Sequence, residues 1–584
     1  MTRPDKYEML EEAARRRGFF WPSFEIYGGA SGFIDFGPVG AGLKRKIEEK
    51  WRDFFVRKQH LAEIVTPIVM PGKVFEASGH VAHFKDPMVE CIGCKRRYRA
   101  DHILRESVPV ETESLTLEEL DRKIRENTVR CPECGGEFSR PEYFQTMFAT
   151  TIGPYSEAVG YCRPEAAQGM FVNFRRVSEI AREKLPLGVA QIGKALRNEI
   201  SPRQGPIRLR EFTIMEFEFF FDPEKKSCDQ LENVANERIR IIPVELRLRG
   251  VEEPLDLTIA DCLRKGYILN EWMAYFMALS KRFVTELGVP LGNQRFHEKL
   301  PKERAHYSAQ TYDHEVFLER WGWTELAGHA YRTDYDLLMH WKHSGVDIRV
   351  FERYEEPIRK KLRVLRPVAS AVRRTFKQRT EEVLELILKV DLNEVEKGFS
   401  EKGYYQFGDL RILPEHVEIK LKEEVETGRR FIPHVVEPSF GAERLVYATL
   451  EYAYSRIKDR TVMRIPRDLA PIQAVVLPLV SRDGLPELAK RIYDDLTSEN
   501  FDVEYDEAGS IGRRYARADE VGVPVAITVD YRTKDDETVT LRDRDSWRQV
   551  RVKTNDLPDV MKRYLSSSIS LEAIGTSLTS KKTS

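Results

Sequence analysis

The chain has 584 residues, of which 41% are hydrophobic and 32% charged, and its mean hydropathy is −0.46. This composition is typical of a globular protein of about four domains and excludes wholesale disorder and fibrous architectures. No apolar run approaches the ~18 residues of a membrane helix, and the first residues lack the apolar segment of a signal peptide. The net charge of −1 excludes a globally basic nucleic-acid coat but allows local basic patches. We therefore expect a cytoplasmic protein with no membrane partner.

The first 85 residues predict two helices and a strand. Residues 7–19 form a short helical pattern. A longer helix is indicated by apolar residues at steps of three and four, namely Leu43, Ile47, Trp51, Phe54 and Phe55. Residues 63–69 predict a strand. Because Pro67 cannot donate a ladder hydrogen bond, we expect that strand at an edge or an interface.

Four of the seven cysteines form two Cys-x-x-Cys pairs, Cys91 with Cys94 and Cys131 with Cys134. They lie in a segment, 86–150, that looks inserted. Four thiolates in this pattern suit a closed, tetrahedral, structural Zn²⁺ site, although the gap of 36 residues is longer than the usual zinc-ribbon gap of about 15–20. Reduced free thiols are the alternative. The other three cysteines are expected to be packing residues.

Residues 191–221 predict a β-hairpin around a loop at 201–206. The period of two puts Met215, Phe217, Phe219 and Phe221 on one face. It puts a charged set on the other: Arg197, Glu199, Glu216 and Glu218, with Phe212 beside them. Taken alone, this charged face is either a functional surface or the solvated side of an antiparallel sheet.

Three segments together favour the functional interpretation. Arg197-Asn198-Glu199, a loop, and the run from Arg208 to Phe212 resemble the second signature motif of class II aminoacyl-tRNA synthetases. Residues 437–444, ending in Glu443-Arg444, resemble the third motif, and the helix at 43–51 with the Pro67 strand resembles the first.

Further sequence segments indicate the subfamily. Residues 78–80, 84–88, 98–102, 163–169 and 509–515 resemble the glycyl-tRNA synthetases of the archaeal/eukaryotic homodimeric type, and the resemblance covers about residues 7–565. There is one departure. The chain has Tyr331 where this family tends to have Asp.

The resemblance implies an α+β fold: the antiparallel-sheet catalytic core of a class II synthetase with inserted domains, plus a C-terminal α/β anticodon-binding domain. The strands and helices expected from 471 onward agree with such a domain. The implied parts are core 1–85 (motif 1), zinc-knuckle insertion 86–150, core 151–340 (motif 2), basic insertion 341–425, core 426–469 (motif 3), anticodon-binding domain 470–565 and a disordered tail 566–584.

The implied activity is ATP-dependent attachment of glycine to the 3′ end of tRNA(Gly) through a glycyl-adenylate, by a homodimer using Mg²⁺. Arg197, Glu199 and Arg444 are the expected catalytic residues. The implied ATP-binding residues are Arg197, Asn198, Glu199, Arg208, Leu209, Phe212, Glu325, Leu326 and Arg444, with Glu325 nearest Mg²⁺. The implied glycine-binding residues are Glu165, Glu216, Glu437, Pro438 and Ser439. Carboxylates around one ammonium suit a substrate that has no side chain to hold.

The expected tRNA contacts are Arg99, Arg373, Arg374, Arg513 and Arg514. Residues 351–380 hold ten Lys or Arg against three Glu, a local charge of +7 that suits acceptor-stem phosphates. The arginines from 513 onward lie beside tyrosines, as in proteins that read unpaired bases. Solvated helix faces are the alternative.

Two other functions remain open. One is a synthetase-like binding protein that has lost adenylation, but the chain retains Arg197, Arg208 and Arg444. The other is a class II synthetase for serine, threonine or proline. Against it, the acidic pocket reserves no residue for a substrate side chain.

Overall fold

The computed structural model describes residues 5–108, 112, 115–154, 158–202, 204–225, 227–457 and 459–577. The chain forms two compact units, one of residues Arg349–Phe431 and one of Met1–Ile348 with Ile432–Ser584. Within the described ranges, no helix is both long enough and apolar enough to span a membrane.

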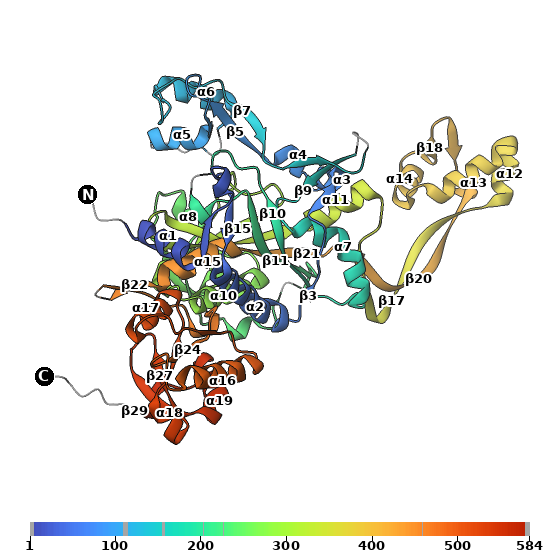
Figure 1. The fold of residues 1–584 in the computed structure, drawn as a ribbon. Helices are drawn as coiled ribbons and strands as arrows, with labels where there is room; N and C mark the ends of the chain where they lie inside the picture. The colour runs from blue at the N-terminus through green and yellow to red at the C-terminus, as the bar shows by residue number, and fades with distance from the viewer. Residues whose placement is uncertain are drawn as a thin grey trace. The chain divides into compact units, whose positions relative to one another are not determined.

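A mostly antiparallel sheet lies at the centre of the larger unit (Figure 1). Among the described residues it has nine strands, in the order β13-β12-β14-β15-β16-β21-β11-β10-β3. Only the pairs β12–β14 and β10–β3 run parallel. The bounds are β3 Ala62–Glu63, β10 Leu187–Leu196, β11 Glu211–Phe221, β12 Arg238–Ile242, β13 Leu255–Thr258, β14 Gln294–Glu298, β15 Gln310–Leu318, β16 Gly322–Thr333 and β21 His434–Gly441.

The β10–β11 hairpin carries the alternation expected from the sequence. Gln191 lies opposite Glu216, and Ala195 lies opposite Phe212. The face of Met215, Phe217, Phe219 and Phe221 packs in the main core, as predicted. The prediction that Arg197 and Glu199 lie on the strand is wrong. The strand ends at Leu196, and the Glu199 N–H donates to Arg197 O, which turns the chain away from the ladder.

Helices cover the core face of this sheet. α2 starts with Pro38, a favoured first residue, and buries the predicted stripe of Leu43, Ile47 and Trp51. A π-helical turn, Arg52–Arg57, continues it and buries both Phe54 and Phe55. The larger unit's helices outside the insertion and the C-terminal domain are α1 Lys6–Arg17, α2 Pro38–Trp51, α3 Gly72–Ala77, α4 His80–His83, α7 Ala167–Ile180, α8 Val244–Arg247, α9 Ile259–Arg264, α10 Glu271–Glu286, α11 Tyr335–Ser344 and α15 Ala442–Ala453.

The single strand predicted for residues 63–69 is wrong. β3 ends at Glu63, and β4 (Val69–Pro71) pairs in a different sheet with β9 (Val159–Cys162), which also pairs with β8 (Ala149–Thr151). Pro67 lies in the break, where its missing N–H interrupts no ladder. Two short hairpins, β1 Phe20–Pro22 with β2 Ile34–Phe36 and β22 Tyr454–Ile457 with β23 Arg460–Met463, complete this part.

The cysteine-bearing segment has a small apolar core of its own, built around Val89, Leu104 and Leu120. Its elements are β5 Lys85–Glu90, β6 Arg97–Arg99, α5 Ala100–Ser107, α6 Leu117–Glu126 and β7 Glu142–Gln145. α6 starts with a capping box between Thr116 and Glu119.

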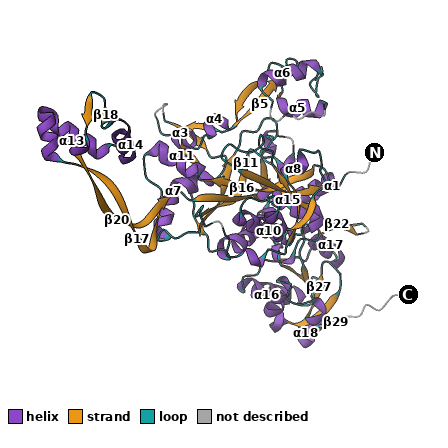
Figure 2. Cartoon of the chain, turned by 180° about the vertical axis from the view of Figure 1, so that it is seen from behind, coloured by secondary structure: helices purple, strands orange, loops and turns teal. Residues whose placement is uncertain are grey.

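The smaller unit is a long two-stranded ribbon with helices at its far end (Figure 2). Its elements are β17 Val350–Pro367, α12 Ala369–Phe376, α13 Thr380–Lys389, α14 Leu392–Lys402, β18 Tyr405–Phe407, β19 Leu410–Ile412 and β20 Val417–Phe431. The basic residues Lys360 and Lys361 face Glu424 and Glu423 across the ribbon. The positive charge of these two lysines is therefore compensated by acidic residues more than sixty positions later.

The C-terminal part is an α/β domain. Among the described residues its sheet has the order β25-β24-β26-β27-β28-β29. Its elements are β24 Ala474–Pro478, α16 Leu485–Ser498, β25 Val503–Tyr505, α17 Ile511–Val521, β26 Val525–Val529, α18 Tyr531–Asp536, β27 Thr538–Asp543, β28 Gln549–Lys553, α19 Leu557–Leu565 and β29 Thr576–Ser577. The tail expected to be disordered begins with ordered residues. Leu571 packs in this domain's core, β29 pairs with β28, and residues 578–584 lie outside the described chain.

Candidate active site

The motif residues meet in a pocket over β11, β16 and β21. The pocket is lined from the loop after β10, from β11 and β16, and from the start of α15. Among the lining residues are Arg197, Glu199, Arg208, Leu209, Phe212, Glu325, Leu326, Glu443 and Arg444. The sequence predicted all of these except Glu443 as ATP-binding residues, and the fold brings them together. Asn198 does not line this pocket; its backbone N–H donates to Thr146 O.

Arg197 lies between two aromatic rings. Its guanidinium carbon is 5.5 Å from the centroid of Phe84 and 5.2 Å from that of Phe212, and its Nε donates to Pro164 O at 3.1 Å. Arg197 also lines a second, acidic pocket next to the first. It can therefore contact ligands in both pockets at once.

Two more arginines are held by carboxylates in the first pocket. Arg208 Nε donates to Glu199 at 2.9 Å, and Arg444 Nη1 lies 3.2 Å from the carboxylate of Glu325. Arg444 is also fixed by bonds to the carbonyls of Ile207 and Glu325. Desolvation raises the pKa of Glu325, but the charges of Lys299 and Arg444 outweigh it and lower the pKa to about 2. Glu325 is therefore an ionised carboxylate, with 40% of its side chain exposed.

The second pocket contains Glu165, Glu216, Glu437 and Ser439, four of the five residues expected to bind glycine. Glu216 accepts a hydrogen bond from Ser439 Oγ at 2.9 Å and one from the Ala166 N–H. Pro438, the fifth, is not part of the lining.

Sequence reasoning missed the residue that organises this pocket. Arg332 is fully buried, and its guanidinium pairs with Glu165 at 3.4 Å, Asp336 at 2.8 Å and Glu437 at 2.8 Å. It also stacks on Tyr307, 3.6 Å from the ring centroid. The signal in the sequence that could have identified Arg332 is that it directly follows Tyr331, where this chain differs from the family pattern. On β16 the two side chains alternate, and Tyr331 turns away to bond His434 at 2.6 Å. The departure therefore lies outside the acidic pocket.

His80, which contacts Glu165 from outside the pocket lining, is a second residue that sequence reasoning did not select. It is buried, its Nδ1 bonds Ser78 Oγ at 2.8 Å, and its Nε2 lies 3.3 Å from Glu165. Burial raises the pKa of Glu165, but the charges of His80 and Arg332 outweigh this and hold it well below its usual range.

The pKa values of the other two carboxyls expected to bind glycine, Glu216 and Glu437, shift in the opposite direction. Burial, with the charge of Glu165, raises the pKa of Glu216 to about 7. Burial also raises the pKa of Glu437 to about 8, against the opposing charge of Arg332. The main cause is desolvation by burial, and the negative charges of the neighbouring carboxylates add to it.

The four predicted cysteine ligands converge. The Sγ atoms of Cys91, Cys94, Cys131 and Cys134 all lie within 4.8 Å of one another. Thiolates at this spacing fit the tetrahedral sulfur set that Zn²⁺ prefers.

Comparison with known proteins identifies the family. A glycine–tRNA ligase of Aeropyrum pernix is 50% identical over 577 residues, covering 98% of this chain and 99% of that protein. Glycine–tRNA ligases of Thermococcus gammatolerans and Methanocaldococcus jannaschii are 47% and 44% identical, each covering 96% of this chain and 99% of their own. The chain belongs to the glycine–tRNA ligase family. An anticodon-binding-domain profile also matches residues 473–564, within the C-terminal α/β domain.

The class II fold expected from the sequence is confirmed. A prolyl-tRNA synthetase of Cryptosporidium parvum, solved with L-proline and AMP, resembles this chain with a TM-score of 0.51. The alignment covers 96% of this chain and 75% of that one, at 12% identity.

The arginines expected to contact tRNA lie in different environments. Arg373 and Arg374 are exposed on α12, and Arg513 is exposed on α17. Arg514 is only 2% exposed and donates to the carbonyls of Pro478 and Gly509, so its guanidinium holds a loop and is not free to contact tRNA. Arg99 is mostly buried, paired with Asp101 at 2.6 Å and Asp86 at 3.1 Å.

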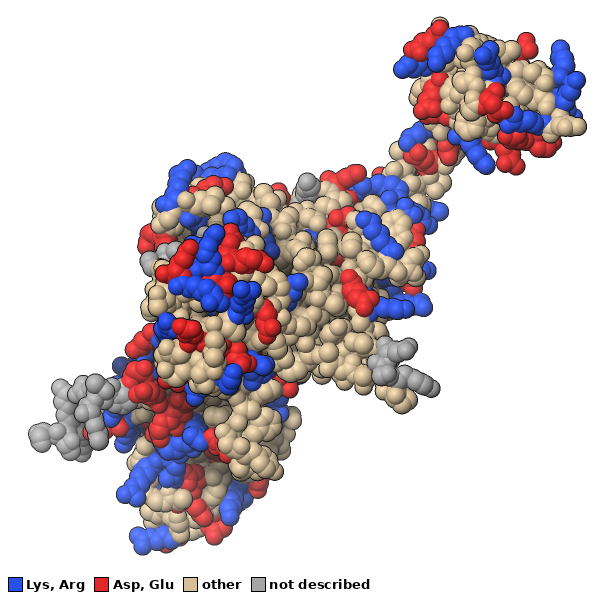
Figure 3. All heavy atoms as spheres, turned by 90° about the horizontal axis from the view of Figure 1, so that it is seen from above, with Lys and Arg blue, Asp and Glu red and all other residues tan. Residues whose placement is uncertain are grey.

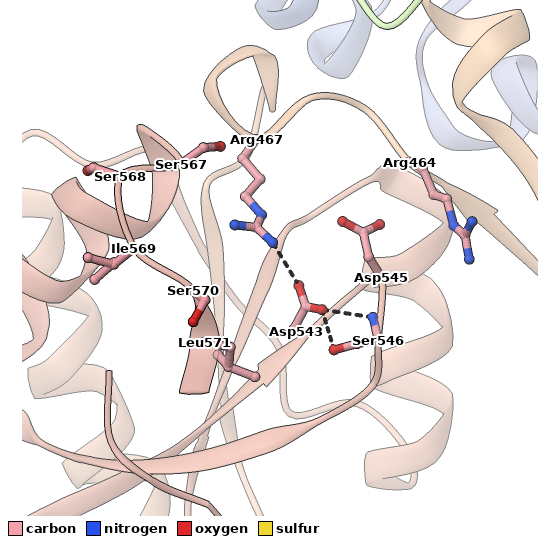
Figure 4. A pocket seen from close by; sticks show the side chains of 10 residues that line it. All are labelled: Arg464, Arg467, Asp543, Asp545, Ser546, Ser567, Ser568, Ile569, Ser570 and Leu571. Carbon is pink, nitrogen blue, oxygen red and sulfur yellow. Dashed lines mark hydrogen bonds and ion pairs between the residues drawn. The ribbon is translucent and has the colours of Figure 1, made fainter. Parts of the chain in front are cut away.

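A separate hollow lies in the C-terminal part (Figure 4). Arg467 on its wall lies 3.8 Å from Asp543 and 4.0 Å from the ring centroid of Tyr564. Asp543 also accepts from the Ser546 N–H at 2.7 Å. These contacts join the C-terminal domain to the segment before it, and none of the motif residues reaches this hollow.

Proposed function

We propose that the chain is an active ligase that attaches glycine to the 3′ end of tRNA(Gly) through a glycyl-adenylate. The observation that carries this proposal is the pair of adjacent pockets. One is lined by arginines and Phe212, the other by carboxylates around Arg332, and Arg197 borders both. A substrate with one ammonium, one carboxylate and no side chain suits the second pocket.

The chemistry assigned to the first pocket is charge neutralisation. A carboxylate oxygen of glycine attacks the α-phosphorus of ATP, and the bond to the pyrophosphate oxygen breaks. Glycine's carboxylate is already ionised, so no general base is required. Arg197 would hold the attacking carboxylate and the α-phosphate, while Arg208 and Arg444 hold the outer phosphates. Phe212 would stack on the adenine, with Arg444 on its other side, and Glu199 would orient Arg208 or accept from the adenine amino group.

Glu325 suits the Mg²⁺ that accompanies ATP. It is an ionised, half-exposed carboxylate on the pocket wall, and Mg²⁺ usually takes one or two carboxylates together with phosphate oxygens and water. The ion would neutralise phosphate charge.

The second pocket would select glycine through its ammonium. Glu165, Glu216 and Glu437 supply the acceptors, and Ser439 holds Glu216. A larger amino acid would be excluded by steric clash, so no editing domain is needed.

The four cysteines would bind one structural Zn²⁺, with no part in catalysis. The described chain has its cysteines free rather than in disulfides, which suits a reducing compartment, and we assign the protein to the cytoplasm.

We further propose a homodimer through the segment around Pro67 and the outer side of α7. Val65 and Ile180 are 87% and 82% exposed, and Ile68, Val69 and Val172 are also exposed. The two elements are in direct contact, because a Cβ on Gly169 would come within 2.1 Å of Thr66 Oγ1. An apolar surface of this kind is typical of a protein interface.

The tRNA would contact two surfaces: Arg373 and Arg374 on α12 at the acceptor stem, and Arg513 on α17 at the anticodon. Arg99 would contact tRNA in a hollow between the cysteine-bearing segment and the loop after β10, where Arg208 lines both this hollow and the first pocket.

The decisive experiment is ATP–pyrophosphate exchange with each amino acid in turn, followed by charging of tRNA. We expect exchange with glycine and little with serine, threonine, proline or alanine. Absence of exchange with every amino acid would favour a binding protein that has lost adenylation. Exchange with another amino acid would reject the assignment of the second pocket.

A further inference from the structure

Lys44 connects the N-terminal helix α2 to the back of the first pocket. Its Nζ donates to Thr213 Oγ1 at 2.9 Å and to Glu48 on its own helix at 2.6 Å. It also lies 3.8 Å from the carboxylate of Glu443. Only 16% of the Lys44 side chain is exposed, so these contacts are largely shielded from water. α2 and α15 pack side by side in the main core (Figure 1).

The two partners of Lys44 are bonded to each other. The Thr213 N–H donates to Glu443 Oε2 at 2.8 Å. Thr213 lies on β11 between Phe212 and Ile214, which both line the pocket, so its own side chain points to the opposite face. Glu443 directly precedes Arg444. One lysine thus holds together the strand that carries Phe212 and the helix start that carries Arg444.

The positive charge of Lys44 has a second effect, because it compensates the negative charge of Glu443. Glu443 is a nearly buried carboxylate, 4% exposed, in the wall of a pocket assigned to a polyanion. Two lysines lie near it, Lys44 at 3.8 Å and Lys194 at 3.9 Å. Lys194 is 43% exposed and therefore well screened by water, whereas Lys44 is shielded. Most of the compensation of the Glu443 charge therefore comes from Lys44.

We propose that Lys44 is a positioning residue for ATP, which fixes Thr213 and Glu443 and thereby aligns Phe212 with Arg444 and prevents Glu443 from repelling the phosphates. This inference rests on the proposed function, because it takes the pocket of Phe212 and Arg444 as the ATP site. Lys44 would thus take part in ATP recognition although it lies on α2, the helix of the first motif, and does not line the pocket.

The test is steady-state pyrophosphate exchange with the full chain bearing Lys44→Met. We expect the KM for ATP to rise about tenfold and the KM for glycine to change less than about twofold, because the acidic pocket does not contact Lys44. Lys44→Arg keeps the cation and should restore most of the ATP affinity. If Lys44 has a purely structural role, Lys44→Met should change the KM for ATP and the KM for glycine alike, or lower the unfolding temperature without a selective effect on ATP.

Two further variants keep the outcome unambiguous. Thr213→Val removes the hydroxyl that accepts from Lys44 and keeps the side-chain shape; it should raise the ATP KM, and its effect should not add to that of Lys44→Met. Lys46→Met, on the same helix, removes a more exposed ion pair with Asp502 and should have no effect on either KM.

Phe212→Ala separates the two proposals. If Phe212→Ala leaves the ATP KM unchanged, the assignment of the ATP site is wrong. If Phe212→Ala raises the ATP KM while Lys44→Met and Thr213→Val both leave it at the wild-type value, the site stands and the inference about Lys44 is overturned.

Discussion

Arg332 donates a hydrogen bond from Nη1 to the carboxylate of Glu437 at 2.8 Å, and both side chains are buried. The same guanidinium also pairs with Asp336 and Glu165. One fixed cation therefore serves three carboxyl groups. Arg197, Lys299 and Arg304 also line the pocket, but the carboxyl side chains of its lining outnumber these cations. A further cation, the ammonium of glycine, would relieve this excess on binding. In the proposed function, the pocket is thus both the glycine site and a group of acids whose ionisation depends on one another.

This coupling predicts that glycine binding depends on pH. Glu216 and Glu437 have pKa values raised to about 7 and about 8 by burial and neighbouring charges. Both must be ionised to accept from an ammonium, so protons compete with glycine below these values. The KM for glycine should rise as the pH falls from about 8 to 6, by up to about tenfold per unit between the two pKa values and more steeply below about 7, while the KM for ATP changes little. A flat glycine KM over this range, measured by pyrophosphate exchange, would show that glycine binding releases no proton from these acids and would contradict the prediction.

Arg197→Ala should abolish adenylate formation while the protein stays folded. Removing a charge-assisted hydrogen bond from the transition state costs on the order of 3 kcal/mol, or roughly 10²-fold or more in rate. Arg238→Ala, which removes an exposed pair with Asp256 between β12 and β13, is the matched control and should keep full activity. Exchange near the wild-type rate in Arg197→Ala would reject the central role of this residue.

The difference between sequence and structure concerns long-range pairing. The alternation on β11 and the α17 helix follow from local periodicity, and both predictions are confirmed. Arg332 was not recognised as a site residue, because two of its three carboxylate partners, Glu165 and Glu437, lie in distant segments that no local pattern connects to it. The basic run at 359–361 suggested an uncompensated charge, but the acidic residues opposite lie on β20. On the face shown in Figure 3, basic and acidic residues are likewise mixed.

A related error concerns neighbours on one helix. Arg513 and Arg514 were both expected to contact tRNA, but consecutive helical residues point about 100° apart. α17 packs against the sheet of its domain, so Arg514 points inward to backbone carbonyls while Arg513 stays exposed. The helix itself could be predicted from the sequence, but the side that faces the sheet could not.

Cys94→Ser should lower the zinc content from about one ion per chain and destabilise the segment between β5 and β7. Metal binding is coupled to folding at such sites, and three thiolates hold Zn²⁺ less tightly than four. Elemental analysis and limited proteolysis measure the two effects, and glycine-dependent exchange should persist. Cys162→Ser, outside the cluster, is the control. Freshly purified wild-type protein without zinc would contradict the assignment.

Val65→Asp should convert the dimer to a monomer. The substitution puts a charge in the centre of the exposed apolar surface formed with α7, and burying an unpaired charge in an interface is strongly unfavourable. Analytical ultracentrifugation at nanomolar concentration should detect the change. Leu421→Asp, at an exposed apolar position on β20, should leave the sedimentation coefficient unaltered. If the wild-type protein is itself a monomer and fully active, the homodimer proposal fails.

The last prediction separates the two tRNA surfaces. Replacing Arg373 and Arg374 with alanine removes two exposed cations with no hydrogen bond or ion pair found among the described residues. It should weaken tRNA binding and reduce the slope of log affinity against log salt by about 0.7–0.9 for each phosphate that is no longer neutralised.

Arg513→Ala should instead raise the KM for tRNA and reduce discrimination between wild-type and anticodon-altered tRNA, since arginine planes stack on unpaired bases. Neither change should affect glycine-dependent pyrophosphate exchange, because none of the three arginines lines the two central pockets. Binding curves at several salt concentrations and charging of both tRNAs distinguish the surfaces. If Arg513→Ala leaves charging of both tRNAs equally unaffected, α17 does not read the anticodon.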